Sequence, residues 1–262
     1  MKPEIGFVGL LSTKQIIDDI RFAVDNGFQW YELALDWPQN FEISEQRLSE
    51  IRETSLQNKL KLVIHTAYYL PMAVPIPEIQ DAVVTNLKTA INIAAKVGSD
   101  RVTVHPGLQQ LPAGAASAGI DALIGNLRRA VDFGAKYGVH ICLENFPKGG
   151  HSLCASLKTY SHVLNKIPDI SATLDVGHVN TTDESPVEYL STLKNFILDM
   201  HIHDNNGKTD EHKCLTEGTL DFYLLLRKCK ELLFKGPFML EMFPYENILR
   251  GRDIFMKMWE DG

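Results

Sequence analysis

Residues 61–105 read KLVIHTAYYLPMAVPIPEIQDAVVTNLKTAINIAAKVGSDRVTVH. The stretch begins and ends with a short run rich in β-branched residues, which predicts strands at Lys61–His65 and Arg101–His105. Apolar residues recur at helical spacing between these runs, so we expect a helix over Glu78–Val97 that ends at Gly98. A strand, a helix and a second strand in this order are typical of a parallel sheet.

The same alternation runs through the rest of the chain. Further strands are predicted at Ile5–Leu10, Trp30–Leu35, His140–Glu144, Ser171–Asp175, Phe196–Ile202 and Pro237–Glu241. Further helices are predicted at Lys14–Asn26, Ser44–Asn58, Ala115–Tyr137, Leu153–Lys166, Pro186–Leu193, Asp221–Leu233 and Ile248–Glu260. Eight strands, each followed by a helix, predict an α/β protein with a (β/α)8 TIM barrel. A doubly wound open sheet is the alternative, but no G-x-G-x-x-G turn follows the first strand.

Length and composition fit one such barrel. The chain has 262 residues, and a TIM barrel usually has about 250. No linker rich in Gly, Ser or Pro divides the sequence, so residues 1–262 are expected to form a single domain. Hydrophobic residues make up 45% and charged residues 23%, a composition that excludes disordered and coiled-coil proteins.

Composition also restricts location and partners. No apolar run approaches the ~18 residues of a membrane helix, and the first residues do not resemble a signal peptide. Four scattered cysteines without a C-x-x-C motif are too few for a disulfide scaffold, so we expect a cytoplasmic protein. The net charge of -7 disfavours nucleic acid as a partner, although a local basic groove or bound metal ions would change that balance. The oligomeric state stays open.

The predicted strand ends bear side chains that bind divalent metal ions. Six consecutive strands end in such a residue, namely His65, His105, Glu144, Asp175, His201 and Glu241. Three more candidates lie in the following loops, namely His178, Asp210 and His212. Active sites of TIM barrels lie at the face where the strands end, and the three long predicted loops, 66–77, 145–152 and 203–220, share that face.

Five histidines and four carboxylates at one face predict a metal centre. Imidazole and carboxylate together suit Zn or Mn, with Fe and Co as further options, whereas Mg prefers oxygen ligands alone. Nine ligands exceed the needs of one ion, so one to three ions are expected. A single histidine at a strand end is usually structural, but six suitable strand ends in register argue against coincidence. Four histidines fall outside this set, namely His140, His151, His162 and His203.

These residues lie in motifs that resemble the xylose-isomerase-like superfamily of TIM barrels. The superfamily includes sugar phosphate isomerases and epimerases, keto-sugar epimerases and endonuclease IV. The matching segments are VIHTAYYLPMAVPIPEI (63–79), TVHPG (103–107), CLENF (142–146), LDVGHVN (174–180), HIHDNNGKTDEHKCLTEGTLDF (201–222) and MLEMF (239–243).

All nine candidate ligands match the trinuclear pattern of endonuclease IV. The resemblance implies a first ion on His65, His105 and Glu144, and a third on His178, Asp210 and His212. It implies a second ion on Glu144, Asp175, His201 and Glu241, with Glu144 as the bridge. The keto-sugar epimerases use only this second set, for one Mn-type ion, and the residue that matches His178 contacts the substrate there.

The neighbouring residues favour the sugar branch. Endonuclease IV has N-T-A-G-Q-G after its fifth strand and L-D-T-C-H at its sixth, where this chain has NFPKGG and LDVGH. Its loop after strand two is basic, whereas LDWPQNFE (35–42) is acidic and apolar. Tyr68 instead resembles endonuclease IV, which has a tyrosine near the DNA at that place.

The favoured function is therefore a metal-dependent isomerase or epimerase of a small sugar or sugar phosphate. Glu144 and Glu241 are the expected base and acid, and His178 is the third catalytic candidate. Substrate contacts are expected from Tyr68, from Glu32 and from Lys148, which is placed to receive a phosphate. Glu32 and Trp30 are expected to line the pocket, although Glu32 is equally consistent with a polar layer inside the barrel, and Lys148 with a solvated turn.

Two other functions are compatible with the same residues. An endonuclease IV-type enzyme would use three zinc ions to hydrolyse a phosphodiester at abasic sites in DNA. A barrel that binds metal or sugar without turnover is the non-enzymatic alternative.

Overall fold

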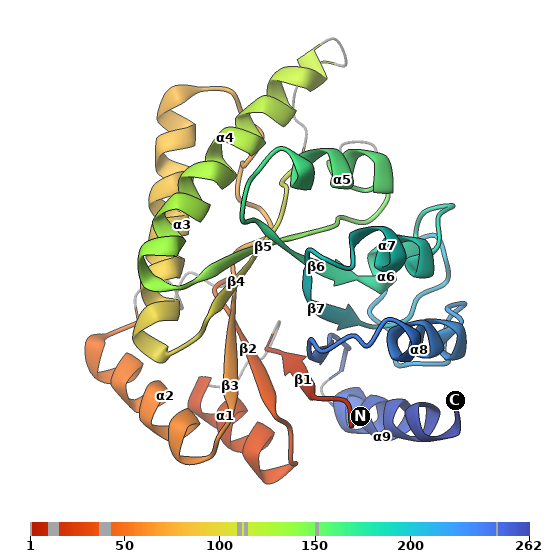
Figure 1. Cartoon of the computed structure of the whole chain (residues 1–262). Helices are drawn as coiled ribbons and strands as arrows, with labels where there is room; N and C mark the ends of the chain where they lie inside the picture. Colours follow the sequence, from red (N-terminus) through yellow and green to blue (C-terminus); the bar gives the residue numbers. More distant parts are fainter. Residues whose placement is uncertain are drawn as a thin grey trace.

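The computed structural model describes residues 2–9, 16–36, 43–108, 112, 115–149, 152–244 and 246–262. Its strands form a closed barrel in the order of the sequence, and every neighbouring pair is parallel. The strands are β1 Ile5–Val8, β2 Trp30–Ala34, β3 Lys61–His65, β4 Arg101–Val104, β5 His140–Glu144, β6 Ser171–Asp175, β7 Ile197–Ile202 and β8 Phe238–Leu240. The predicted TIM barrel is confirmed, and Figure 1 shows helices surrounding its strands.

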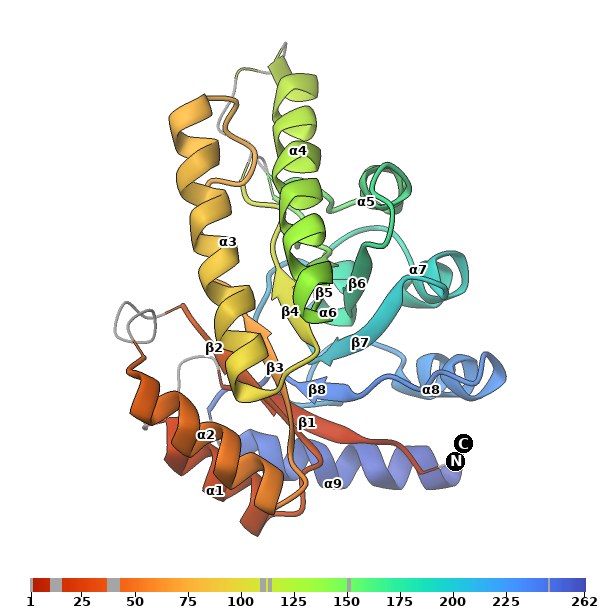
Figure 2. The same ribbon diagram turned by 60° about the vertical axis from the view of Figure 1, so that its left-hand side comes forward.

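Helices connect the strands on the outside of the barrel. They are α1 Ile16–Asp25, α2 Glu45–Gln57, α3 Pro77–Val97, α4 Ala116–Gly134, α5 Leu157–Asn165, α6 Val176–Asn180, α7 Pro186–Leu193, α8 Phe222–Glu231 and α9 Glu246–Asp261, with a 3-10 turn at Ala135–Tyr137. Helices α3 and α4 stand side by side in both views (Figures 1 and 2). No helix in the described ranges is long and apolar enough to span a membrane.

Two helices differ from the prediction in ways that affect the site. Helix α5 begins at Leu157 rather than Leu153, because the Ser156 hydroxyl accepts a hydrogen bond from the Thr159 backbone and caps the helix there. Helix α6 was not predicted, since five residues are too few to show a helical period. It begins directly after β6, where the Asp175 side chain caps it by accepting a bond of 2.6 Å from the His178 backbone.

Two layers of apolar side chains hold the barrel together. The larger layer lies between the strands and the helices, where outward residues such as Phe7, Leu33 and Ile64 are fully buried. A smaller cluster of Val8, Trp30, Val63 and Met239 fills the barrel interior. The remaining inward positions lie at the C-terminal ends of the strands, around one opening.

Trp30 does not reach that opening. It begins β2, its indole nitrogen donates to Glu4, and the Arg101 guanidinium lies 4.7 Å from its ring centre. These contacts lie at the N-terminal ends of the strands, because Trp30 is paired with Lys61 at the start of β3. The suggestion that Trp30 lines the pocket is therefore wrong, and the reason is its position in the strand.

Candidate metal centre

Four consecutive strands bring one residue each into a buried cluster. The inner group consists of Glu144, Asp175, His201 and Glu241, which offer ligand atoms within 4.8 Å of one another. His201 Nδ1 lies 3.0 Å from a Glu241 oxygen, 3.5 Å from a Glu144 oxygen and 3.8 Å from an Asp175 oxygen. Strand register explains this convergence, because Asp175 pairs with His201 across β6 and β7.

A second cluster shares Glu144 with the inner group. We call it the His65 group, and it consists of His65, His105 and Glu144. Glu144 Oε2 lies 3.1 Å from His105 Nε2 and 3.8 Å from His65 Nε2, whereas Glu144 Oε1 faces His201. The two oxygens of Glu144 thus face two different clusters, which is the arrangement of a bridging carboxylate.

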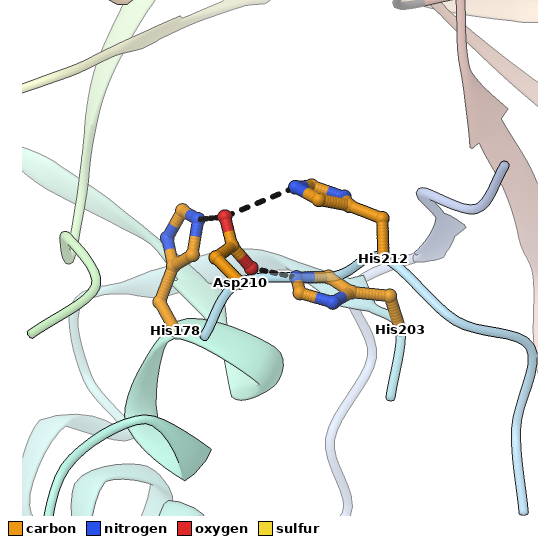
Figure 3. Close-up of side chains that lie close together, drawn as sticks. All are labelled: His178, His203, Asp210 and His212. Carbon is orange, nitrogen blue, oxygen red and sulfur yellow. Dashed lines mark hydrogen bonds and ion pairs between the residues drawn. The ribbon is translucent and has the colours of Figure 1, made fainter. Parts of the chain in front are cut away.

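Figure 3 shows a third cluster of side chains. The outer group consists of His178, His203, Asp210 and His212. The Asp210 carboxylate is at its centre, with Oδ2 at 3.2 Å from His178 Nε2 and 3.1 Å from His212 Nε2. His178 is supplied by α6, whereas Asp210 and His212 lie in the connection between β7 and α8.

All nine predicted ligands therefore belong to these three clusters. His203 was set apart from them in the prediction, and the structure corrects this, since its Nε2 lies 3.6 Å from Asp210 Oδ1. The signal that would have found it is the HIH sequence at 201–203, because alternate residues of a strand point to the same side.

Neighbouring acceptors determine which ring nitrogen of each histidine is free. Glu32 Oε2 lies 2.9 Å from His201 Nε2, and Asp36 Oδ2 lies 3.1 Å from His65 Nδ1. Each carboxylate accepts an N–H there, so the opposite nitrogen of each ring keeps its lone pair for the cluster. The backbone oxygens of Asn145 and Glu241 have the same role for Nδ1 of His178 and His212, respectively.

Glu32 and Asp36 thus contact histidines of the clusters, which the sequence did not indicate. Glu32 was expected to contact the substrate or to form a polar layer. It is fully buried inside the barrel, and its carboxylate contacts His201. Asp36 follows β2, lies 8% exposed and also accepts the backbone N–H of Tyr68. No sequence pattern marked Asp36, because its contact depends on how the chain turns after β2.

The charges of the clusters stabilise one another. Burial raises the pKa of Glu144, but the neighbouring His105 and His201 outweigh this and hold it well below its usual range. Burial lowers the pKa of His65, but Asp36 outweighs this and raises it to about 9. Carboxylates that stay ionised inside a protein are good ligands for a cation.

The donor atoms fit divalent metal ions. Buried atoms without a hydrogen-bond partner among the described residues include both Glu144 oxygens, His65 Nε2, His201 Nδ1 and Glu241 Oε2. An unpaired buried polar atom costs about 1–3 kcal/mol, more if it is charged. All of these atoms belong to residues of the inner and His65 groups, so cations bound there would satisfy them together. Mixed imidazole and carboxylate donors suit Zn, Mn, Fe or Co.

A cavity of about 500 Å³ adjoins the clusters. It is lined by His65, Tyr68, His105, Phe146, Pro147, His178, Asp210, Glu211, His212, Glu241 and Phe243. Three aromatic rings, those of Tyr68, Phe146 and Phe243, form its apolar walls. None of the described residues that line it is a lysine or an arginine.

Lys148 lies away from this cavity. Its ammonium group is 3.0 Å from Asp183, and the side chains of both residues are mostly exposed to solvent. The position matches a solvated turn rather than a phosphate contact. Gly150 and His151 of the same loop lie outside the described residues, as does the segment 37–42 of the acidic loop.

A first prediction follows from the Glu32–His201 contact. Replacing Glu32 with leucine should weaken metal binding by about 10- to 100-fold, because His201 loses the acceptor that orients its ring. Glu32→Gln keeps an acceptor oxygen and should retain most of the affinity. Titration of the metal-free variants with Mn²⁺ measures this, with circular dichroism as the check on folding. Equal affinities of the two folded variants would contradict the orienting role.

Two curated proteins are similar to this chain over most of its length. Among curated relatives, an uncharacterised protein of Methanocaldococcus jannaschii, MJ1311, is 27% identical over 225 residues, which are 83% of this chain and 76% of the relative. A probable endonuclease 4 of Halothermothrix orenii is 26% identical over 208 residues, which are 70% of this chain and 73% of the relative.

Two solved structures share the fold of this chain. A D-tagatose 3-epimerase-like protein aligns with a TM-score of 0.90 and 24% identity, over 98% of this chain and 97% of that one. Endonuclease IV from Thermus thermophilus aligns with a TM-score of 0.79 and 19% identity, over 99% of this chain and all of that one. Both likenesses show the fold of this chain.

The family model for xylose isomerase-like TIM barrels matches residues 20–257, which is most of the chain. This protein is therefore a member of the xylose isomerase-like TIM barrel family.

Proposed function

We propose that the protein is a metal-dependent isomerase or epimerase of a small sugar that transfers a proton at a carbon next to a carbonyl group. The observation that carries the proposal is the cavity beside the inner group. Glu241 lines it directly, and Glu144 contacts His178, a second lining residue, at 3.3 Å. Two carboxylates of one buried cluster are thus placed beside a space of the size of a small ligand.

The metal-binding residues of this proposal are the nine predicted ligands within the three clusters. The inner group would hold the ion that matters for the reaction, with the His65 and outer groups as further sites. A divalent ion bound there would polarise the substrate carbonyl and stabilise the negative charge of an enediolate.

The chain's own residues would move the proton. Glu144 and Glu241 belong to the same cluster, so one takes the proton from carbon and the other supplies the proton that restores it. Which of the two acts first depends on the configuration of the substrate. His178 lines the cavity, and its Nε2 would bind a substrate hydroxyl when the outer group holds no ion. The rings of Phe146, Phe243 and Tyr68 restrict the access of water.

The charge of the cavity favours a substrate without phosphate. Binding a phosphate group ordinarily requires Arg, Lys or a cluster of backbone N–H groups. The described lining has no Lys or Arg and includes the carboxylates of Asp210, Glu211 and Glu241. Lys148, the one lysine that the sequence suggested, is paired with Asp183 outside it. A neutral ketose or aldose fits this surface best.

The endonuclease remains the second candidate because the outer group completes a third cluster. The candidate is disfavoured by charge, because contacts to DNA phosphates come mostly from Lys, Arg and backbone amides. Between Leu33 and Gln46 the sequence has no Lys or Arg but has Glu42 and Glu45, besides Asp36, which is buried against His65. The net charge of -7 adds to this repulsion.

The test is a comparison of substrates at equal metal loading. We expect turnover of at least one unphosphorylated ketose or aldose, weaker turnover of its phosphate ester, and no incision of a duplex with an abasic site at low salt. The sugars are followed by chromatography and the oligonucleotide by gel electrophoresis, each with Mn, Zn, Mg and Co. Efficient incision together with no conversion of any sugar would establish the second candidate instead.

A further inference from the structure

His203 contacts a carboxylate of each of two clusters. Its Nε2 lies 3.1 and 3.2 Å from the two oxygens of Asp175, in the inner group, and 3.6 Å from Asp210 Oδ1, in the outer group. Its ring is fully buried and stacks on that of His212, with centres 4.1 Å apart and planes at 15° (Figure 3). One imidazole thus lies between both clusters.

Gly177 provides the space for this ring. A Cβ atom at Gly177 would lie 2.0 Å from Cε1 of His203 and 2.4 Å from each of its ring nitrogens. Gly177 lies within α6, between the cap Asp175 and the ligand candidate His178. The glycine is therefore required by the close approach of His203.

The stacking decides between two roles for His203. Asp210 Oδ2 lies 3.2 Å from His178 Nε2 and 3.1 Å from His212 Nε2, as expected if these three residues bind one ion. A histidine ligand places the ion about 2.0–2.1 Å from its nitrogen and close to the ring plane. Two nearly parallel rings 4.1 Å apart cannot both have such an ion in their planes. His212 is oriented toward the position that an ion bound by Asp210 Oδ2 would take. The stacked ring of His203 therefore cannot bind the same ion.

The remaining role is that of a donor to Asp175. Asp175 Oδ1 accepts the backbone N–H of His178 at 2.6 Å and lies 3.1 Å from His203 Nε2. His203 Nε2 also lies 3.2 Å from Oδ2, so its N–H is shared by both oxygens and fixes the carboxylate, while Oδ2 lies 3.8 Å from His201 Nδ1. Such outer partners commonly determine the affinity of a metal site.

We propose that His203 is a positioning residue that orients Asp175 in the inner group, supports His212 in the outer group, and so couples the two. Its Nε2–H donates to Asp175, and its ring stacks on His212. The inference rests on the metal centre of the proposed function but not on the reaction. Metal binding is therefore the readout, and it separates failure of this inference from failure of the proposed activity.

The test compares His203→Ala and His203→Gln with the wild-type protein. The alanine removes the donor, whereas the glutamine amide reaches about as far as Nε2 and still donates. We expect His203→Ala to weaken binding of Mn²⁺ by about 10- to 100-fold and His203→Gln to restore most of it. The number of bound ions and the visible spectrum of bound Co²⁺ should not change in His203→Gln. His162→Ala, which removes an exposed imidazole of α5, is the matched control.

A double-mutant cycle tests independently whether Gly177 provides the space for the His203 ring. Gly177→Ala alone should weaken metal binding, because the new methyl group displaces His203. In the presence of His203→Ala the same change should cost nothing further, since the nearest atoms to that methyl group all belong to His203.

Three results would overturn the inference. Loss of one ion per chain in His203→Gln would make His203 a ligand. Unchanged affinity in folded His203→Ala would leave it without a role in metal binding. Additive effects of Gly177→Ala and His203→Ala would mean that the glycine serves another purpose.

Discussion

Glutamine in place of Glu144 is expected to abolish metal binding at the shared position and to lower kcat/KM by about a thousandfold or more. Glu144 is 1% exposed, its oxygens face His105 and His201, and both oxygens lack a hydrogen-bond partner among the described residues. Glutamine keeps the size but replaces a charged oxygen with an amide. Metal content and turnover should therefore fall together.

Two comparisons make the Glu144→Gln result specific. Glu231→Gln removes a mostly exposed carboxylate of α8 and should leave metal content and turnover unchanged. His212→Ala should remove only the ion of the outer group, with partial loss of sugar conversion. Metal analysis and steady-state kinetics on the folded variants provide the data. Wild-type sugar conversion by Glu144→Gln would exclude Glu144 as both base and bridge.

Removal of metal is expected to abolish turnover and lower the Tm. Ligands that bind only the native state stabilise it, by about 2.7 kcal/mol at a hundredfold excess over Kd. The clusters without cations also retain several buried atoms that lack a hydrogen-bond partner among the described residues, which adds to the cost. Dialysis against a chelator, followed by calorimetry and activity assays, measures both effects. Restoration by Mn or Zn, but not by Ca, is the expected control, and an unchanged Tm and activity after chelation would refute the metal centre.

The strand ends were predictable from the sequence because parallel strands of a barrel end at one face. A histidine or carboxylate at the end of six successive strands therefore had to converge, and these residues do converge with the three loop candidates. The boundaries of the strands were predictable to within about a residue where β-branched runs ended sharply, as at His65 and Glu144.

The supporting residues were not predictable in the same way. Glu32 contacts His201 across 169 positions of the chain, and Asp36 contacts His65 across 29. Those contacts depend on barrel closure and on the turn after β2, which local patterns do not encode. Lys148 was ambiguous for a similar reason, because its direction depends on the path of the loop after β5. His203 was predictable from the sequence, because alternation along a strand places it on the same side as His201, although the prediction set it apart.

The entry of solvent deuterium into a sugar tests the central claim most directly. Incubation in deuterated water with Mn²⁺ and an unphosphorylated ketose or aldose should place deuterium at the carbon next to the carbonyl, as seen by NMR. Glu144→Gln under the same conditions should place none there. Conversion of the sugar without deuterium, or incision of an abasic duplex without exchange in any sugar, would contradict proton transfer by the carboxylates of the inner group.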